Sequence, residues 1–553
     1  MNRSFLRLRR GRNWRRALAP FSPSLSSLPS FSPSSSSSSS SLSPLSQAPA
    51  ASARTYKRPS TAPKPIIDIK HIRQNVELYE ANCEWRNYKR QAGHPARIAQ
   101  LHAQWQGLQR EGRGLRERSN LLRKQLANSA TSSGDEDVEE LRRMSWERIQ
   151  EQARAVKAEL AGIERQEAQA LAEMEALALE LPNLTSADTP LGAEPVVLSH
   201  INERPRFADE EAAAAAGGEG GRAAEQEGGG GEGEGEGRGN IWRSHVHIGA
   251  ELGILDFAGA ATASGWGWYY LLGEGAQLEQ ALVQYALAVA TRHGWAQVAP
   301  PSVVYSHIGA ACGFQPRDQH GEQQVYALAQ SPADAARGAP ELCLAGTAEI
   351  PLAGMKSGAT LDAAALPLKR AAASRCFRAE AGARGAETKG LYRVHEFTKV
   401  ELFAWTLPDE LPARDVFEEM LDIQTEILSS LGLWCRVLAM PSADLGASAA
   451  RKVDIEAWFP SREHHSGGWG EVTSASMCLD YQSRRLATRF KQPAAEKPGF
   501  PWTCNGTALA VPRVLAALLE CGWDEQAGTV TIPECLRPWM DGKEKIGPAP
   551  RRY

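Results

Sequence analysis

FRAEAGARGAETKGLYRVHEFTKVELF, residues 377–403, is the stretch of this 553-residue chain that decides the fold. Arg378 and Glu380 alternate with apolar residues, so a strand would place both charges on one face. A return strand follows, with Glu401 facing the same way. The glycine-rich, charged middle, residues 382–390, suits a mobile loop over a ligand better than a tight turn. The pattern therefore predicts an antiparallel hairpin beside a ligand; the alternative is a surface hairpin with solvated ion pairs.

Two downstream blocks also set charged groups among apolar residues. GEVTSASMCLDYQSRRLATRF, residues 470–490, opens a β-like run in which Glu471 and Ser474 offer oxygen ligands for Mg²⁺. NGTALAVPRVLAALLE, residues 505–520, places Arg513 before an apolar helix predicted over 514–520. Because a helix N-terminus is already positive, an arginine there predicts an anion site.

A third block, LAGTAEIPL, residues 344–352, lies upstream of the hairpin and sets Thr347 and Glu349 in an apolar segment. Together these blocks, in this order, resemble the signature motifs of class II aminoacyl-tRNA synthetases. The FRxE run is similar to motif 2, NGTALAVPR to motif 3, and residues 265–304 to motif 1, the dimer interface in that class. TAEIPL and EVTSAS narrow the resemblance to the seryl-tRNA synthetase family, over about 66–533.

The resemblance implies an α+β fold: an N-terminal antiparallel helical hairpin, or coiled coil, then a class II domain built on an antiparallel β-sheet flanked by helices. It also implies a homodimer that acts as a serine–tRNA ligase. L-serine and ATP give seryl-adenylate and pyrophosphate, and the seryl group then passes to the 3′ end of tRNA(Ser). The first step is an in-line attack by an already ionised carboxylate, so positioning and charge neutralisation carry it.

The family's nucleotide roles carry over residue by residue. The resemblance assigns ATP binding to Arg378, Ala379, Glu380, Val394, His395, Glu396, Phe397, Glu471, Val472, Thr473, Ser474 and Arg513. Arg378 would hold the α-phosphate, Phe397 would stack on adenine, and Arg513 would clamp the γ-phosphate. Arg378, Glu471 and Arg513 are therefore the expected catalytic residues. Glu471 and Ser474 would bind Mg²⁺.

The serine site implied by the resemblance comprises Thr347, Ala348, Glu349, Arg378, Glu401 and Thr507. Thr347, Glu349 and Glu401 would take the ammonium and hydroxyl groups of the amino acid, and Thr507 would close the pocket. Position 507 is Thr where many bacterial members have Ser, which changes pocket volume and keeps the hydroxyl.

A heptad-like pattern precedes these motifs. Apolar residues recur at alternating three-four spacing over 98–126, with Gly112 and Ser119 in weak slots, and again over 149–177 with Glu167 in one slot. The polar turn 128–137 separates the two runs, which predicts an antiparallel hairpin roughly 45 Å long at ~1.5 Å per residue. A basic stripe marks the first arm: Arg110, Arg113, Arg116, Arg118, Arg123 and Lys124. It resembles the family's tRNA-binding arm; the alternative is a structural or dimerisation coil.

The N-terminus has a different composition. No acidic residue precedes Asp68, and seven arginines within 3–16 lead into a Ser/Pro-rich tract. This composition is typical of an organellar transit peptide, so residues 1–58 are predicted to direct the chain to the mitochondrial matrix; the alternative is a basic arm that binds nucleic acid. Without residues 1–58 the chain keeps 52 basic and 65 acidic residues, a net charge of −13. Any RNA binding must then come from local patches.

The remaining organisation follows from composition. The hairpin domain is predicted over 64–182 and the catalytic domain over 190–553, with an Ala/Gly/Glu-rich insertion at 212–239 expected to be a disordered surface loop. No stretch reaches the ~20 apolar residues of a membrane span. Nine scattered cysteines and two histidine pairs, 245/247 and 464/465, lack companion ligands, so no zinc site is expected.

Two other functions remain open. A synthetase homologue that aminoacylates a carrier protein would keep the adenylation motifs but should lack the long basic hairpin. A non-catalytic paralogue should have lost Arg378, Glu471 or Arg513, and all three are present.

Overall fold

The computed structural model describes residues 59–127, 144–204, 243–314, 324–380, 390–463, 466–493 and 496–548. The predicted transit peptide 1–58, the turn 128–137, the insertion 212–239, the loop 382–390 apart from Gly390, and the pair His464 and His465 lie outside them. The described chain falls into two compact units, one over 66–184 and the other from 185 onward together with 59–65.

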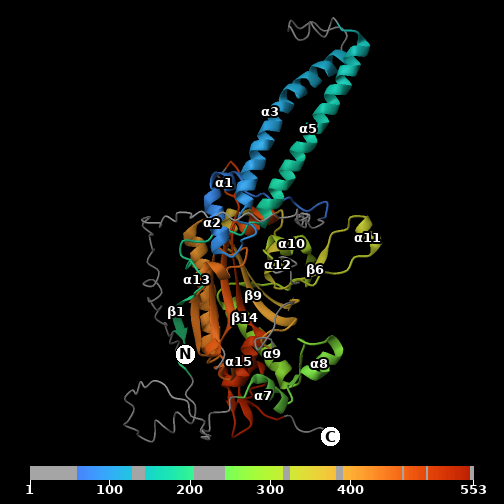
Figure 1. Ribbon diagram of the computed structural model, residues 1–553. Helices are drawn as coiled ribbons and strands as arrows, with labels where there is room; N and C mark the ends of the chain where they lie inside the picture. Colours follow the sequence, from blue (N-terminus) through green and yellow to red (C-terminus); the bar gives the residue numbers. More distant parts are fainter. Residues whose placement is uncertain are drawn as a thin grey trace, which may run out of the picture. The chain divides into compact units, whose positions relative to one another are not determined.

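The first unit is the helical hairpin (Figure 1). Its helices are α1 (Ile69–Gln74), α2 (Val76–Trp85), α3 (His94–Ala127) and α5 (Trp146–Glu180). The short helix α1 begins at Asp68, whose carboxylate accepts from the backbone N–H of His71 at 2.9 Å. Helices α3 and α5 run antiparallel, as predicted, and their periodic apolar residues such as Ile98, Leu122 and Ile149 are buried between them.

Two positions that break the apolar heptad pattern, Gly112 on α3 and Glu167 on α5, are related through Arg116. The guanidinium of Arg116 donates to both carboxylate oxygens of Glu167, at 2.7 and 2.8 Å. A Cβ on Gly112 would lie 3.0 Å from the Arg116 guanidinium, so the glycine leaves room for this arginine to reach the opposite arm. The Glu167 side chain is only 10% exposed. A single polar pair of this kind inside a coil fixes the register of its helices.

The second unit is built on an eight-stranded sheet in the order β1-β10-β11-β12-β14-β9-β8-β4, antiparallel except between β4 and β8. Its strands are β1 (Val196–Ile201), β4 (Ala296–Gln297), β8 (Leu368–Phe377), β9 (Glu396–Thr406), β10 (Cys435–Ala439), β11 (Arg451–Trp458), β12 (Trp469–Leu479) and β14 (Trp502–Ala510). With the helical hairpin, this sheet confirms the predicted α+β fold.

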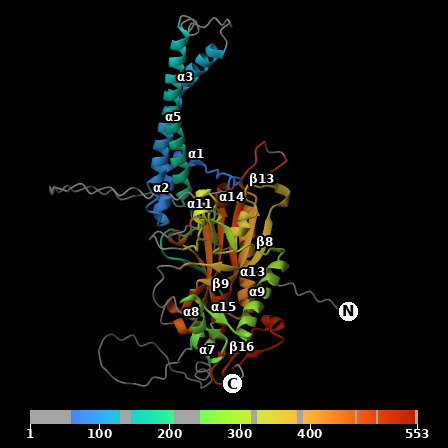
Figure 2. The same ribbon diagram turned by 90° about the vertical axis from the view of Figure 1, so that its right-hand side faces the viewer.

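Three long helices cover one face of the sheet (Figure 2). They are α9 (Glu274–Arg292), α13 (Glu410–Ser430) and α15 (Val511–Cys521). Their apolar sides bury alternate strand residues, including Val400 and Leu402 of β9. Phe403 and Trp405, which point to the other face, join a second core beneath α10 (Ser306–Ala311), α12 (Glu349–Gly354) and α14 (Tyr481–Leu486). The two faces of β9 therefore have different roles.

Smaller elements complete the unit. They are α7 (His245–Glu251), α8 (Phe257–Ser264), α11 (Pro332–Ala336), β2 (Leu255–Asp256), β3 (Tyr270–Leu271), β5 (Val303–Tyr305), β6 (Leu342–Leu344), β7 (Thr360–Asp362), β13 (Arg489–Lys491), β15 (Trp523–Asp524), β16 (Thr529–Thr531) and β17 (Lys545–Ile546). Among the described residues, no helix has the length and apolar composition needed to cross a bilayer.

The sequence pattern placed the motif hairpin correctly but misplaced two element boundaries. Strands β8 and β9 pair from Leu368↔Trp405 to Phe377↔Glu396, so Arg378 and Glu380 lie beyond the end of β8 and not within a strand. Glu380 has φ +46°, which ends the extended backbone there. Helix α15 begins at Val511, because Pro512 is favourable in the first turn, and so Arg513 lies inside that turn.

We predict that Glu167→Ala weakens the hairpin locally, because it leaves Arg116 without its partner between the arms. Hydrogen exchange of amides in the middle of α3 and α5 should report an opening free energy lower by roughly 1–2 kcal/mol. The matched control is Glu173→Ala, which removes the more exposed pair with Arg97 at 2.8 Å and should cost no more than about 0.5 kcal/mol. Equal losses in the two variants would contradict a register role for Arg116.

Candidate active site

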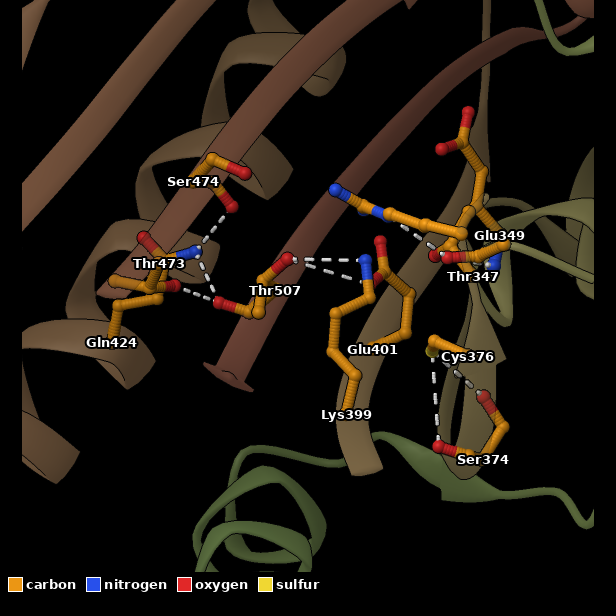
Figure 3. Close-up of polar contacts among 12 residues, drawn as sticks. Thr347, Glu349, Ser374, Cys376, Lys399, Glu401, Gln424, Thr473, Ser474 and Thr507 are labelled. Atoms are coloured by element: carbon orange, nitrogen blue, oxygen red, sulfur yellow. Dashed lines mark hydrogen bonds and ion pairs between the residues drawn. The ribbon is translucent and has the colours of Figure 1, made fainter. Parts of the chain in front are cut away.

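The strand β9 carries the centre of the site on its face away from the long helices. Phe397, Lys399 and Glu401 alternate on that face, in line with Phe403. The Glu401 side chain is fully buried, and its Oε2 lies 2.5 Å from the Lys399 ammonium. The same ammonium donates to Thr507 Oγ1 at 3.3 Å, as Figure 3 shows. A buried cation therefore holds a buried carboxylate and a hydroxyl together.

A second buried carboxylate lies at the start of α12. Glu349 is 5% exposed, its backbone N–H donates to Thr347 Oγ1 at 3.3 Å, and Ala348 between them is buried. Burial raises the pKa of Glu349 to about 8, and the neighbouring Glu401 adds to the rise, against the opposing effects of Lys399, Gln482 and Arg378. The structure thus brings together the predicted serine-site residues Thr347, Glu349, Glu401 and Thr507 on one side of the sheet (Figure 3).

A bulge in β12 turns Glu471 and Ser474 to the same face. Glu471 pairs with Glu456 of β11 and Ser474 pairs with Asp454, which leaves one extra residue, Val472, on β12. In a regular strand, residues three apart point to opposite faces, so the bulge is what makes these two predicted ligands neighbours. Val472 itself is buried in the core beneath the long helices.

The first turn of α15 places Arg513 beside Glu471. The Arg513 guanidinium donates to the Glu471 backbone oxygen at 2.8 Å and its carboxylate at 3.1 Å, and to the Tyr392 backbone oxygen at 3.1 Å. Burial alone would raise the pKa of Glu471, but Arg513, Lys452 and Arg378 lower it to about 2. Glu471 is therefore an anion at neutral pH, and its side chain is 42% exposed and open to a cation.

Arg378 lies between the two groups of residues. Its Nε donates to the Gly346 backbone oxygen at 3.4 Å, and its guanidinium carbon is 5.3 Å from the Phe397 ring centre. This contact places a cation beside an aromatic face. The next residues are tied down as well: Ala379 N–H donates to the Gln324 oxygen at 3.1 Å, and Glu380 pairs with Arg393 at 2.8 Å.

Several positions in the predicted ATP set point elsewhere. Val394 is buried, and Glu396 faces the helix side, where it pairs with Arg375 at 3.4 Å. His395 donates its backbone N–H to the Gly267 oxygen at 3.0 Å, and its ring packs among Trp266, Trp268 and Tyr326. The Thr473 hydroxyl donates a hydrogen bond to the Thr507 backbone oxygen. The Glu396 and Thr473 side chains are therefore already bonded within the protein.

The site also contains groups that the motif pattern did not single out. Lys399 lies inside the quoted stretch, and its period-two spacing with Glu401 was the available signal. Gln482 donates to Glu349 Oε1 at 2.6 Å, but nothing in the sequence links positions 349 and 482. Asp454 pairs with Lys452 at 2.6 Å and lies beside Ser474, but it is one of four charged residues in β11, and nothing in the sequence sets it apart from them.

The histidine pair 245/247 has no metal-site geometry. His245 Nδ1 is 2.7 Å from Glu520 Oε1, and its Nε2 accepts from Leu391 N–H at 3.0 Å, so both ring nitrogens are used. His247 pairs with Ser244 at 2.9 Å. Within the described ranges, no group of three or more His, Cys, Asp and Glu side chains is arranged to hold a metal ion.

A cavity of about 570 Å³ lies behind the segment that leads into β9. It is lined by Ser244, His245, Val246, His247, Phe257, Ala261, Gly265, Trp266, Gly267, Trp268, Gly390, Tyr392, Ser461 and Arg462. None of the predicted serine-site residues lines it, so this cavity is separate from the polar cluster described above.

Comparison with known proteins agrees with this arrangement. Residues 66–185 match the family model of the seryl-tRNA synthetase N-terminal domain, and residues 334–521 match that of the tRNA synthetase class II core domain (G, H, P, S and T). The chain is 35% identical to the serine–tRNA ligase of Rubrobacter xylanophilus over 496 residues, which cover 88% of this chain and all of that one.

Mitochondrial relatives match as well. Identity to the mitochondrial serine–tRNA ligase of Saccharomyces cerevisiae is 46% over 306 residues, 55% of this chain and 65% of that relative. Identity to the mouse mitochondrial enzyme is 34% over 491 residues, 87% of this chain and 84% of that one. The crystal structure of seryl-tRNA synthetase from Pyrococcus horikoshii complexed with ATP superposes with a TM-score of 0.71 at 29% identity, covering 88% of this chain and all of that one.

The sheet, its motif residues and the core-domain match define a class II aminoacyl-tRNA synthetase catalytic unit. Within that class, the full-length matches narrow the assignment further. The chain belongs to the seryl-tRNA synthetase family.

We predict that Lys399→Met destabilises the catalytic unit, because the buried Glu401 carboxylate would lose its ion-pair partner. Removing one partner of a buried pair costs about 3 kcal/mol, so the Tm of this unit should fall by at least ~5 °C. Lys369→Met is the control: its pair with Glu419, at 2.7 Å, is more exposed and should cost about 1 kcal/mol or less. A Lys399 variant as stable as the control would show that the pair is not what holds Glu401.

Proposed function

We propose that this chain is a serine–tRNA ligase that activates L-serine with ATP and transfers the seryl group to the 3′ end of tRNA(Ser) for organellar protein synthesis. The observation that carries this proposal is the buried cluster in which two carboxylates, Glu349 and Glu401, meet the hydroxyl of Thr507. A small amino acid with an ammonium and a hydroxyl group matches this set of acceptors and donors.

Serine recognition is assigned to the unsatisfied part of that cluster. Glu401 Oε1 is buried and has no hydrogen-bond partner within the part of the chain that the structure describes. An orphaned buried acceptor costs about 1–3 kcal/mol, which a donor from the substrate would recover. Glu349 and Thr347 would bind the ammonium, and Glu401 with Thr507 the hydroxyl. Alanine would leave Glu401 Oε1 without a donor, so rejection by about 10⁴ or more is expected.

The nucleotide is assigned to the adjoining cations. Arg378 would hold the α-phosphate, where negative charge grows in the transition state, while Phe397 would stack on adenine. Arg513 would bind the terminal phosphate and keep ATP bent. Because the serine carboxylate is already ionised, no side-chain base is needed, and the residues act by orienting the two substrates.

The donor set at β12 fits Mg²⁺. Glu471 supplies an ionised, accessible carboxylate and Ser474 a hydroxyl on the same face, and these are hard oxygen ligands. Mg²⁺ usually takes one or two protein oxygens and completes its shell with phosphates and water. Bound there, the ion would neutralise charge on the phosphates, and Glu471 and Ser474 would fix its position.

The helical hairpin is assigned to tRNA. Five of the six predicted basic residues are exposed on α3; they are Arg110, Arg113, Arg118, Arg123 and Lys124. Arg116 is instead paired with Glu167 between the arms, so its contribution would be structural. The long basic hairpin also favours tRNA over a carrier protein as the acceptor. The intact Arg378, Glu471 and Arg513 favour catalysis over a non-catalytic role.

The remaining assignments extend the same proposal. Domain boundaries of 64–182 and 190–553 agree with the two compact units and the matched ranges. A homodimer through motif 1 is supported by the exposed apolar side chains of Trp266, Tyr270 and Leu272. The mitochondrial relatives and the composition of residues 1–58 support import into the matrix.

We predict that Arg378→Ala cuts serine-dependent ATP–pyrophosphate exchange by at least ~10²-fold, because it removes a charged donor from the developing phosphate charge. The matched control is Arg375→Ala, three residues earlier, whose side chain pairs with Glu279 and Glu396 on the helix side of the sheet. The control should stay within about threefold of wild type on this reasoning. An Arg378→Ala variant whose activity also stays within about threefold of wild type would contradict the assignment of this stretch to motif 2.

For the hairpin, we predict that reversing the exposed charges of Arg113, Arg118 and Lys124 to Glu raises the KM for tRNA by at least ~10-fold and leaves pyrophosphate exchange unchanged. The control reverses three exposed basic residues of the other arm: Arg154, Lys157 and Arg165. Filter binding at several salt concentrations should show a shallower salt dependence for the α3 variant only. Equal effects of the two triple variants would argue against a specific basic stripe.

A further inference from the structure

A buried chain of hydrogen bonds reaches the serine cluster from behind. Thr503 Oγ1 on β14 donates to Gln482 Oε1 at 2.7 Å, and Gln482 Nε2 on α14 donates to Glu349 Oε1 at 2.6 Å. Thr503 and Gln482 are 1% and 0% exposed, so no water competes for these groups. Three residues that are far apart in sequence thus form one linear relay.

The relay has a direction. An amide has a donor end and an acceptor end, and only its donor end suits an ionised carboxylate. The Thr503 hydroxyl donates to the amide oxygen at 2.7 Å, whereas its other acceptor, the Leu479 backbone oxygen, is 3.5 Å away. The shorter bond turns the amide nitrogen toward Glu349. The reverse orientation would set an oxygen against the carboxylate, and that is favourable only if Glu349 carries a proton. Thr503 therefore acts on Glu349 through Gln482.

This inference rests on the proposed function: we propose that Gln482, oriented by Thr503, is a positioning residue that keeps Glu349 aimed at the substrate ammonium in its acceptor form, and so sets how serine affinity depends on pH. Neither residue needs to touch the substrate. The chemical class recognised through the relay is a primary ammonium group on an α-amino acid.

The other charged and titratable groups around Glu349 do not replace the relay. Glu401 and burial raise the pKa of Glu349, and burial is the larger cause, whereas Lys399 and Arg378 lower it and Gln482 does so through its hydrogen bond. The buried thiol of Cys312 also lies close, and burial, helped by Glu349, raises its pKa above the ordinary range, so it stays neutral. Lys399 is held by Glu401 and Thr507. Gln482 alone donates a direct hydrogen bond to the Glu349 side chain among the described residues.

The sign of the effect follows from the raised pKa. With a pKa of about 8, Glu349 gains charge as the pH rises through that value, so the KM for serine should fall with rising pH and then level off. Removing the amide donor favours the protonated form and raises that pKa further. The loss of affinity should therefore be largest at low pH and recover at high pH.

The test uses serine-dependent ATP–pyrophosphate exchange of the full mature chain from about pH 6.5 to about 9.5, a range that spans both expected midpoints. Gln482→Met keeps the shape and removes the amide; it should raise the KM for serine about tenfold at pH 7 and move the midpoint of its pH profile upward by roughly one unit. The KM for ATP should stay within twofold of wild type, because no nucleotide residue is bonded to Gln482 in the described part of the chain.

Thr503 provides the matched pair. Thr503→Val removes the hydroxyl and should shift the midpoint in the same direction, whereas Thr503→Ser keeps it and should match wild type. Because Thr503 acts only through Gln482, the double variant Gln482→Met/Thr503→Val should behave like Gln482→Met alone. Additive losses would overturn the relay.

Two results separate this inference from the proposed function. A wild-type chain that shows no serine-dependent exchange at any pH would defeat the proposed function and the relay with it. An active wild type whose Gln482→Met variant keeps the same midpoint, or loses serine and ATP affinity in equal measure, overturns the relay and leaves the proposed function standing. Thermal unfolding of each variant checks that the fold is kept.

Discussion

The ion pair between Lys399 and Glu401 is the interaction on which the catalytic unit depends. Both side chains are buried on the site face of the central sheet, 2.5 Å apart, and Glu349 adds a second carboxylate to the same space. Charges in such a place cost free energy unless they are matched, and among the described residues Lys399 and Arg378 are the cations that lower the pKa of Glu349. Under the proposed function, the ammonium group of the substrate would add a further cation beside these carboxylates. Next to this pair, α12 and α14 contribute the polar side chains of Glu349 and Gln482, whereas farther along β9 the same face packs Phe403 and Trp405 into an apolar core.

The sheet makes that arrangement possible by separating its two faces. Alternate residues of β9 either join the core beneath α9, α13 and α15 or point into the site, so packing and chemistry use the same strand without conflict. In β12 the bulge at Val472 changes this alternation, because one extra residue brings both Glu471 and Ser474 to the site face. In the helical hairpin, by contrast, most facing positions are apolar and the polar pair Arg116–Glu167 interrupts them. The other basic residues of the predicted stripe are exposed.

How much of this the sequence could predict depends on whether the signal was local. The hairpin of β8 and β9 and the arms α3 and α5 followed from periodicity. Apolar residues that recur every second residue, or at alternating intervals of three and four, can be recognised within one continuous segment. The boundaries at Phe377 and Val511 did not, because φ +46° at Glu380 and the helix-starting Pro512 act on single residues. The relay from Thr503 through Gln482 to Glu349 was out of reach, since it joins three segments only in the folded chain. Arg116 was grouped with its exposed neighbours because the pattern shows spacing and not which side chain turns inward.

The most direct test of the account is the amino-acid dependence of ATP–pyrophosphate exchange by the purified chain lacking residues 1–58. Exchange should proceed with serine, and kcat/KM for alanine should be lower by about 10⁴ or more, because alanine has no hydroxyl to donate to the unpaired Glu401 Oε1. Glycine should be equally poor, and threonine should be limited by pocket volume. Exchange with alanine within about tenfold of serine would contradict the central claim, since a site built on hydrogen bonds to a hydroxyl cannot accept a substrate that lacks it.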